Sequence, residues 1–106
     1  MLTSEPTHLD EFMTDETSIR FQVRFEGRVQ GVGFRMTTVS LAQGLDVQGT
    51  VRNEHDGSVL LDIEGDRKTL ERLISRIQRE MADNIRSTRI DERPIQNQSG
   101  GLRISH

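Results

Sequence analysis

Residues 19–35, IRFQVRFEGRVQGVGFR, carry the pattern from which the fold can be predicted. The first eight of them alternate between apolar and polar side chains, which is the two-residue period of a half-buried strand. Three glycines follow, at positions 27, 31 and 33. Apolar side chains then recur from Phe34 to Leu45 at the spacing of one helix face, and we expect Gly44 to end that helix. The segment and its continuation predict a strand, a glycine-rich loop and a helix.

Further strands are predicted downstream of this helix. Residues 47–52 and 59–63 alternate in the same way as the first strand. The segment 53–57 between them contains Asp-Gly, which is a strong hairpin signal. Residues 85–90 form a strand candidate so rich in charge that we expect it at an edge of the sheet, and residues 102–104 could add a short last strand.

A second helix is predicted from Leu70 to Met81, where apolar residues again share one helix face, with Asp66 as its N-cap. The order is therefore βαββαβ. Each helix must bury its apolar face against the sheet, and right-handed crossovers place both helices on the same face. We predict an α+β fold of the ferredoxin-like βαββαβ sandwich type, an antiparallel sheet with two helices on one face and a short fifth strand. This fold serves many functions, so it does not decide the function.

Charge divides the chain into two parts. The 106 residues have a net charge of −3, yet residues 1–18 contain five acids and neither Lys nor Arg. We predict a flexible acidic tail at 1–18 and one domain at 19–106, on which a charge of about +2 remains. A mildly cationic domain suits an anionic substrate, but it is too weakly basic for broad nucleic-acid binding.

Composition excludes several classes of site. The chain has no cysteine, which excludes a thiol nucleophile and a Cys-ligated zinc ion. Its three histidines, His8, His55 and His106, lack ligand spacing, so no metal is expected. We find neither a signal peptide nor a run of the ~18 apolar residues that a membrane span needs. We therefore expect a cytoplasmic protein with no membrane partner and no cofactor.

The glycine-rich loop is the candidate chemical site. Glycines let successive backbone N–H groups turn inward around an anion, and the following helix points its free N–H groups the same way. The spacing matches neither a dinucleotide-binding nor a Walker motif. Arg35 could grip two phosphate oxygens, although an arginine at a helix start is more often a solvated surface residue. Asn53 could hold a water by donating and accepting at once, although asparagine is also common at turns.

Two blocks of the chain, GRVQGVGFR at 27–35 and GTVRNEHDGSV at 49–59, resemble the acylphosphatase family. The resemblance is good from Ile19 to Met81 and weaker beyond. It implies a ferredoxin-like enzyme that hydrolyses acyl phosphates to a carboxylate and inorganic phosphate without a metal or cofactor. It also implies that Asn53 orients the attacking water. The implied phosphate-binding residues are Arg35 and the backbone amides of Arg28, Val29, Gln30, Gly31, Val32, Gly33 and Phe34.

The sequence departs from the family where large aromatic residues are common, with Met36 and Thr50 in their place. We expect both to make the acyl side of the pocket smaller or looser. No protein base is evident near either block except His55, whose place in a turn disfavours that role. The resemblance implies that the substrate's own phosphate takes the water proton. The acids Asp62, Glu64 and Asp66 alternate along a strand into a turn and are expected to face solvent.

The same fold also occurs with other functions. A non-catalytic, regulatory phosphate-binding domain would not need Asn53. RNA-recognition domains stack bases on aromatic residues of their central strands, and residues 59–63 contain none. The same domain also begins larger carbamoyl-phosphate-handling maturation proteins, but here nothing follows His106. The sequence therefore favours a free-standing, monomeric acylphosphatase.

Overall fold

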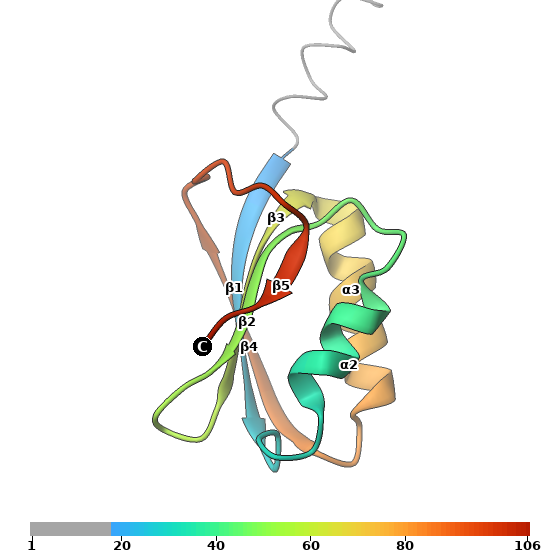
Figure 1. The fold of residues 1–106 in the computed structure, drawn as a ribbon, viewed down its shortest axis with the longest axis vertical. Coiled ribbons are helices and arrows are strands. Elements are labelled where there is room, and N and C mark those ends of the chain that lie inside the picture. Colours follow the sequence, from blue (N-terminus) through green and yellow to red (C-terminus); the bar gives the residue numbers. More distant parts are fainter. Residues whose placement is uncertain (1–17) are drawn as a thin grey trace, which may run out of the picture.

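Residues 18–106 are described in the computed structural model, so residues 1–17, which make up nearly all of the predicted acidic tail, lie outside the described residues. The elements are β1 (Ser18–Gly27), α2 (Phe34–Leu41), β2 (Gln48–Asn53), β3 (Val59–Asp66), α3 (Arg67–Glu80), β4 (Ile85–Arg93) and β5 (Leu102–Ile104) (Figure 1). Each predicted strand and helix is present, although α2 ends at Leu41, before the predicted end at Gly44. Helix α3 begins at the predicted cap, where the Asp66 carboxylate accepts a hydrogen bond of 3.3 Å from the Lys68 amide.

The sheet has the strand order β4-β1-β3-β2-β5, which confirms β4 at an edge. The pairs β1–β3, β1–β4 and β2–β3 are antiparallel, as predicted for the sheet. The fifth strand differs, because β5 runs parallel to β2 and makes the sheet mixed. The physical reason is the connection: residues 94–101 cross the sheet at the end where β4 finishes and β2 begins, so β5 starts beside the start of β2 (Figure 1). The C-terminal ends of β2 and β5 therefore lie together.

Both helices pack on one face of the sheet (Figure 1). Alternate residues of the central strands point to this face and are buried against the apolar side of α3. Burying each such side chain stabilises the fold by about 1.5–3 kcal/mol. The buried residues of β1, β3 and α3 are Phe21, Val23, Phe25, Val59, Leu61, Ile63, Leu70, Leu73, Ile74 and Ile77.

The opposite face of the sheet is polar, and the segment 94–101 covers part of it. The Arg20 guanidinium donates to both carboxylate oxygens of Asp62, at 2.9 and 2.7 Å. Glu64 is buried and accepts hydrogen bonds from the backbone amides of Gln96 and Gln98, at 2.8 and 3.2 Å. The expectation that Asp62 and Glu64 face solvent is therefore wrong, because a distant segment folds over them. Asp66 is exposed, as expected.

Candidate functional site

The loop between β1 and α2 has the backbone of an anion-binding turn. Gly31 and Gly33 have φ angles of 77° and 76°, and Gly33 is the N-cap of α2. A side chain in this left-handed region costs roughly 1–2 kcal/mol, so glycine is the residue that permits the turn. The first amide after the loop to join the α2 ladder is that of Thr37, which donates to the Gly33 carbonyl at 2.9 Å. The amides before it are therefore free to face a ligand.

The loop amides are not all equivalent. The Arg28 amide donates to the Asn84 carbonyl at 2.9 Å. Within residues 18–106, none of the hydrogen bonds has an amide of Val29 to Phe34 as its donor. Arg28 was expected to contribute an amide to the phosphate, but its N–H is already satisfied by the protein. The amides that can bind an anion are those of residues 29–34.

A side chain ties this loop to the hairpin turn after β2. The Gln30 carboxamide donates to the carbonyl oxygens of Glu54 and Ser58, at 2.8 Å each. The turn is itself closed by the Glu54 amide, which donates to the Ser58 carbonyl at 2.9 Å. Hydrogen bonds from the Ser58 hydroxyl and amide lower the pKa of the Asp56 carboxyl in the same turn. Gln30 was predicted only as a backbone donor, and no local pattern indicates this role of its side chain.

The two predicted catalytic side chains lie in one pocket. Asn53 ends β2 two residues after the buried Val51, so its side chain points to the helix-covered side of the sheet. Arg35 comes from the first turn of α2, which lies on that side (Figure 1). The pocket has a volume of about 310 Å³. Its lining residues are Val29, Gly31, Gly33, Phe34, Arg35, Met36, Asn53, Ile104 and His106.

The electrostatic character of this pocket is positive. No acidic residue lines it, and within residues 18–106 Arg35 makes no ion pair. In the same part of the chain, Asn53 makes no side-chain hydrogen bond. A guanidinium without a counter-ion, next to free backbone amides and a free carboxamide, is suited to bind a tetrahedral anion and a water.

Apolar residues anchor the loop and border its mouth. Below the loop Val29 and Phe34 are buried, with the Phe34 ring 5.1 Å from that of Phe25. Met36 lines the pocket with 70% of its surface exposed; its place on the acyl side stays a prediction. The expectation for Thr50 is wrong, because Thr50 is not among the lining residues. It lies opposite Asp62 in the β2–β3 ladder and so faces the other side of the sheet.

Sequence reasoning missed two residues of the pocket, Ile104 and His106. The Nη1 atom of Arg35 lies 3.5 Å from Nδ1 of His106. Both residues reach the pocket because β5 pairs in parallel with β2, a long-range contact without a local sequence signal. His55, the doubtful base, does not line the pocket.

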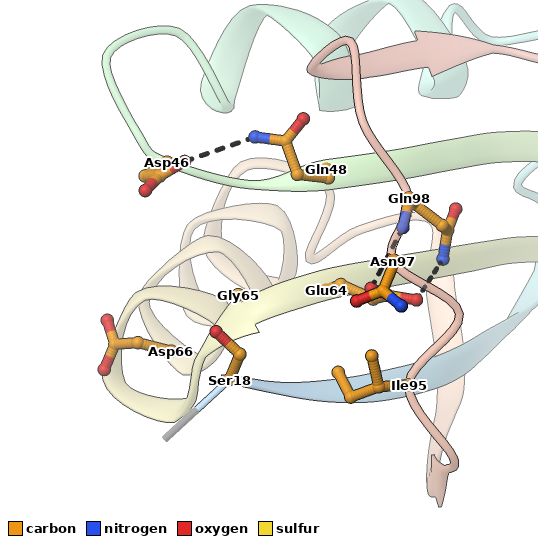
Figure 2. Close-up of a pocket in the computed structure, with 9 residues that line it drawn as sticks. All are labelled: Ser18, Asp46, Gln48, Glu64, Gly65, Asp66, Ile95, Asn97 and Gln98. Carbon is orange, nitrogen blue, oxygen red and sulfur yellow. Dashed lines mark hydrogen bonds between the residues drawn. The ribbon is translucent and has the colours of Figure 1, made fainter. Parts of the chain in front are cut away.

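A larger hollow of about 370 Å³ lies at the opposite end of the sheet (Figure 2). Its charged residues, Asp46, Glu64 and Asp66, would repel an anion. Figure 2 shows that the Gln98 side chain and backbone amide both donate hydrogen bonds to Glu64, so the Glu64 carboxylate already has partners within the protein.

In the described part of the chain, no group of three or more His, Cys, Asp or Glu side chains is placed to hold a metal ion. None of its helices is long and apolar enough to cross a membrane.

Known proteins resemble this chain in sequence and in fold. The acylphosphatase of Salinibacter ruber is 52% identical over 65 residues, which is 61% of this chain and 68% of that protein. The acylphosphatase of Lactobacillus johnsonii is 51% identical over 55 residues, 52% of this chain and 60% of that protein. The crystal structure of acylphosphatase from Bacillus subtilis superposes with a TM-score of 0.73 at 23% identity, covering 83% of this chain and 99% of that one.

At that identity the structural likeness shows the fold. The segments matched in the two sequence relatives span about two thirds or less of those proteins. The family model for acylphosphatase covers more, matching residues 21–104, from the first strand through β5. The chain therefore belongs to the acylphosphatase family.

Proposed function

We propose that this protein hydrolyses acyl phosphates to a carboxylate and inorganic phosphate, using the pocket between the glycine-rich loop and the end of β2. One observation carries the proposal. Arg35 and Asn53 come from different elements, yet both line a pocket that has free loop amides and no acidic residue. Family membership supports the same activity.

The phosphoryl group would be bound by the amides of residues 29–34 and by the Arg35 guanidinium. Charge-assisted bidentate contacts of this kind are stronger than neutral hydrogen bonds and hold the phosphorus atom in a defined orientation. Phosphoryl transfer depends mainly on such positioning and on stabilising the charge that spreads over the transferred oxygens. Since the loop glycines set the amides in place before binding, little reorganisation is needed.

Asn53 would orient the attacking water. Its carbonyl oxygen can accept a hydrogen bond from the water, while its NH₂ group donates to a phosphoryl oxygen. The water oxygen forms a bond to phosphorus as the bond from phosphorus to the acyl oxygen breaks, and the carboxylate leaves with the electron pair. The water proton passes to a phosphoryl oxygen. Because a carboxylate is a good leaving group, no strong general acid is required.

Benzoyl phosphate hydrolysis tests the proposal. The full chain, with a chelator present, should release benzoate and inorganic phosphate in equal amounts. The Arg35→Ala variant should lose this activity, while Arg72→Ala, which removes an exposed arginine of α3 outside the pocket, should retain it. Tight phosphate binding without turnover in the wild type would instead identify a regulatory binding domain.

A monomeric state and a cytoplasmic location stay predictions. Light scattering after size-exclusion chromatography tests the monomeric state.

A further inference from the structure

His106 is placed beside both catalytic candidates by the parallel pairing of β5 with β2. In that ladder Val51 lies opposite Ile104, and the Ser105 amide donates to the Val51 carbonyl at 2.9 Å. Two residues further along each strand are Asn53 and His106. Because side chains alternate along a strand, His106 points to the same side of the sheet as Asn53. Its imidazole accordingly lines the pocket that holds Arg35.

The contact between His106 and Arg35 is loose. The distance of 3.5 Å between Nδ1 of His106 and Nη1 of Arg35 exceeds the 2.7–3.2 Å that is typical of a strong N–H hydrogen bond. The two nitrogens therefore lie next to each other on one wall of the pocket without a strong hydrogen bond between them. Both remain available to a ligand that lies against them.

The groups that face His106 make this wall unusual. Helix α2 contributes Arg35, which is permanently charged, and β2 contributes Asn53, which is neutral. The loop contributes only apolar residues and glycine, and β5 contributes Ile104. Within residues 18–106, neither Arg35 nor His106 forms an ion pair with a carboxylate. Two basic side chains side by side, with no acidic side chain among the residues that line the pocket, favour a multivalent anion.

We propose that the imidazolium form of His106 is a second cationic contact for the phosphoryl group, next to Arg35, and that it strengthens anion binding as the pH falls. The inference rests on the proposed function only in taking this pocket as the phosphoryl site. Imidazole side chains change charge in the neutral range. A dianion between the two side chains attracts both, and by linkage protonation of His106 and binding of the anion favour each other. The contribution is present at low pH and is lost as the pH rises.

Direct binding of sulfate to the full chain tests the inference, because sulfate remains a dianion throughout the relevant range. By calorimetry, the wild type should bind sulfate about 3- to 10-fold more tightly at about pH 5.5 than at about pH 8. In His106→Asn, which keeps a polar side chain that does not titrate, the affinity should be weaker at low pH and should not depend on pH. His106→Lys should bind tightly at both pH values.

His55→Asn is the matched control, because His55 is exposed in the hairpin turn and does not line the pocket. It should bind sulfate with the wild-type pH dependence. Wild-type pH dependence in His106→Asn, or no sulfate binding to the wild type at either pH, would overturn the inference. The proposed hydrolysis fails separately: a protein whose sulfate affinity depends on His106, but which does not cleave benzoyl phosphate, would retain this contact and lose the enzymatic function.

Discussion

The Gln30 side chain donates a hydrogen bond of 2.8 Å to the Ser58 carbonyl, although 28 residues separate the two. A second bond of the same length to the Glu54 carbonyl makes this carboxamide the link between the phosphate loop and the turn that follows Asn53. The pocket is therefore aligned by a residue that does not line it. Its alignment can be disturbed without removing any group that would touch the substrate.

Gln30→Ala should separate alignment from contact. Loss of the two hydrogen bonds should lower the free energy of unfolding by about 1–3 kcal/mol and raise KM for benzoyl phosphate several-fold, since the loop and the turn can move apart. Thermal denaturation and steady-state kinetics measure the two effects. Gln43→Ala, at an exposed position after α2, should change neither. A Gln30→Ala variant with wild-type stability and KM would show that the loop holds its place without this link.

Replacement of Arg35 should abolish most of the activity. Arg35→Ala should reduce kcat/KM by at least ~100-fold, because a charge-assisted contact to the transferred oxygens is lost. Arg35→Lys should also fail, since an ammonium group cannot reproduce the planar fork of the guanidinium. If Arg35→Lys retained most of the activity, charge alone would be sufficient and the bidentate geometry would be wrong.

Asn53→Ala should affect turnover and leave binding largely intact. The side chain would touch the attacking water, while the loop amides and Arg35 would still hold the phosphoryl group. We expect kcat to fall sharply and the inhibition constant of inorganic phosphate to stay within about 2-fold of wild type. Inhibition of benzoyl phosphate hydrolysis by inorganic phosphate gives this constant for the wild type and for Asn53→Ala. Equal losses of turnover and phosphate affinity would assign Asn53 to binding instead of to the water.

The Arg20–Asp62 pair should make stability depend on pH. Burial disfavours the ionised Asp62 carboxyl, but hydrogen bonds from Arg20, Gln22 and Gln98 outweigh it and lower the pKa of Asp62. A carboxyl with a lowered pKa stabilises the fold at neutral pH, and this contribution disappears as the pH falls through the range below about 4. Urea denaturation between about pH 2 and 6 should reveal the loss.

The matched variants for this pair are Asp62→Asn and Asp83→Asn. Asp62→Asn should lower the free energy of unfolding at neutral pH by about 2–4 kcal/mol, because Arg20 is left buried without its counter-ion. It should also flatten the acid dependence. Asp83 is exposed, and its replacement should leave stability near wild type. An Asp62→Asn protein as stable as the wild type would mean that the pair contributes little.

Much of the fold and part of the site could be predicted because their signals are local. The alternation in β1, the helical spacing in α3 and the Asp-Gly turn each lie within a few residues. Placing Arg35 at the loop and Asn53 at the end of β2 followed from the same elements. The position of Thr50 was open to the same reasoning, because Thr50 and Asn53 are three residues apart on one strand and must point to opposite faces.

The remaining features depend on contacts between distant segments. Glu64 is buried because the backbone of residues 96–98 lies over it, and no pattern around Glu64 predicts that cover. The direction of β5 follows from the path of residues 94–101, which contain two adjacent glycines, Gly100 and Gly101, and no hydrophobic period. His106 was therefore the residue of the pocket that sequence reasoning was least able to find.

The parallel attachment of β5 has a consequence for proteolysis. Ile104 and His106 form one wall of the pocket, and residues 94–101 connect them to β4. This connecting segment lies on the surface, and most of its residues are exposed. A protease that cuts the chain once in this segment would leave Ile104 and His106 held only by the noncovalent contacts of the three-residue β5, while the four antiparallel strands and both helices keep their own pairing. Inactivation by limited digestion should therefore precede any loss of helical circular dichroism.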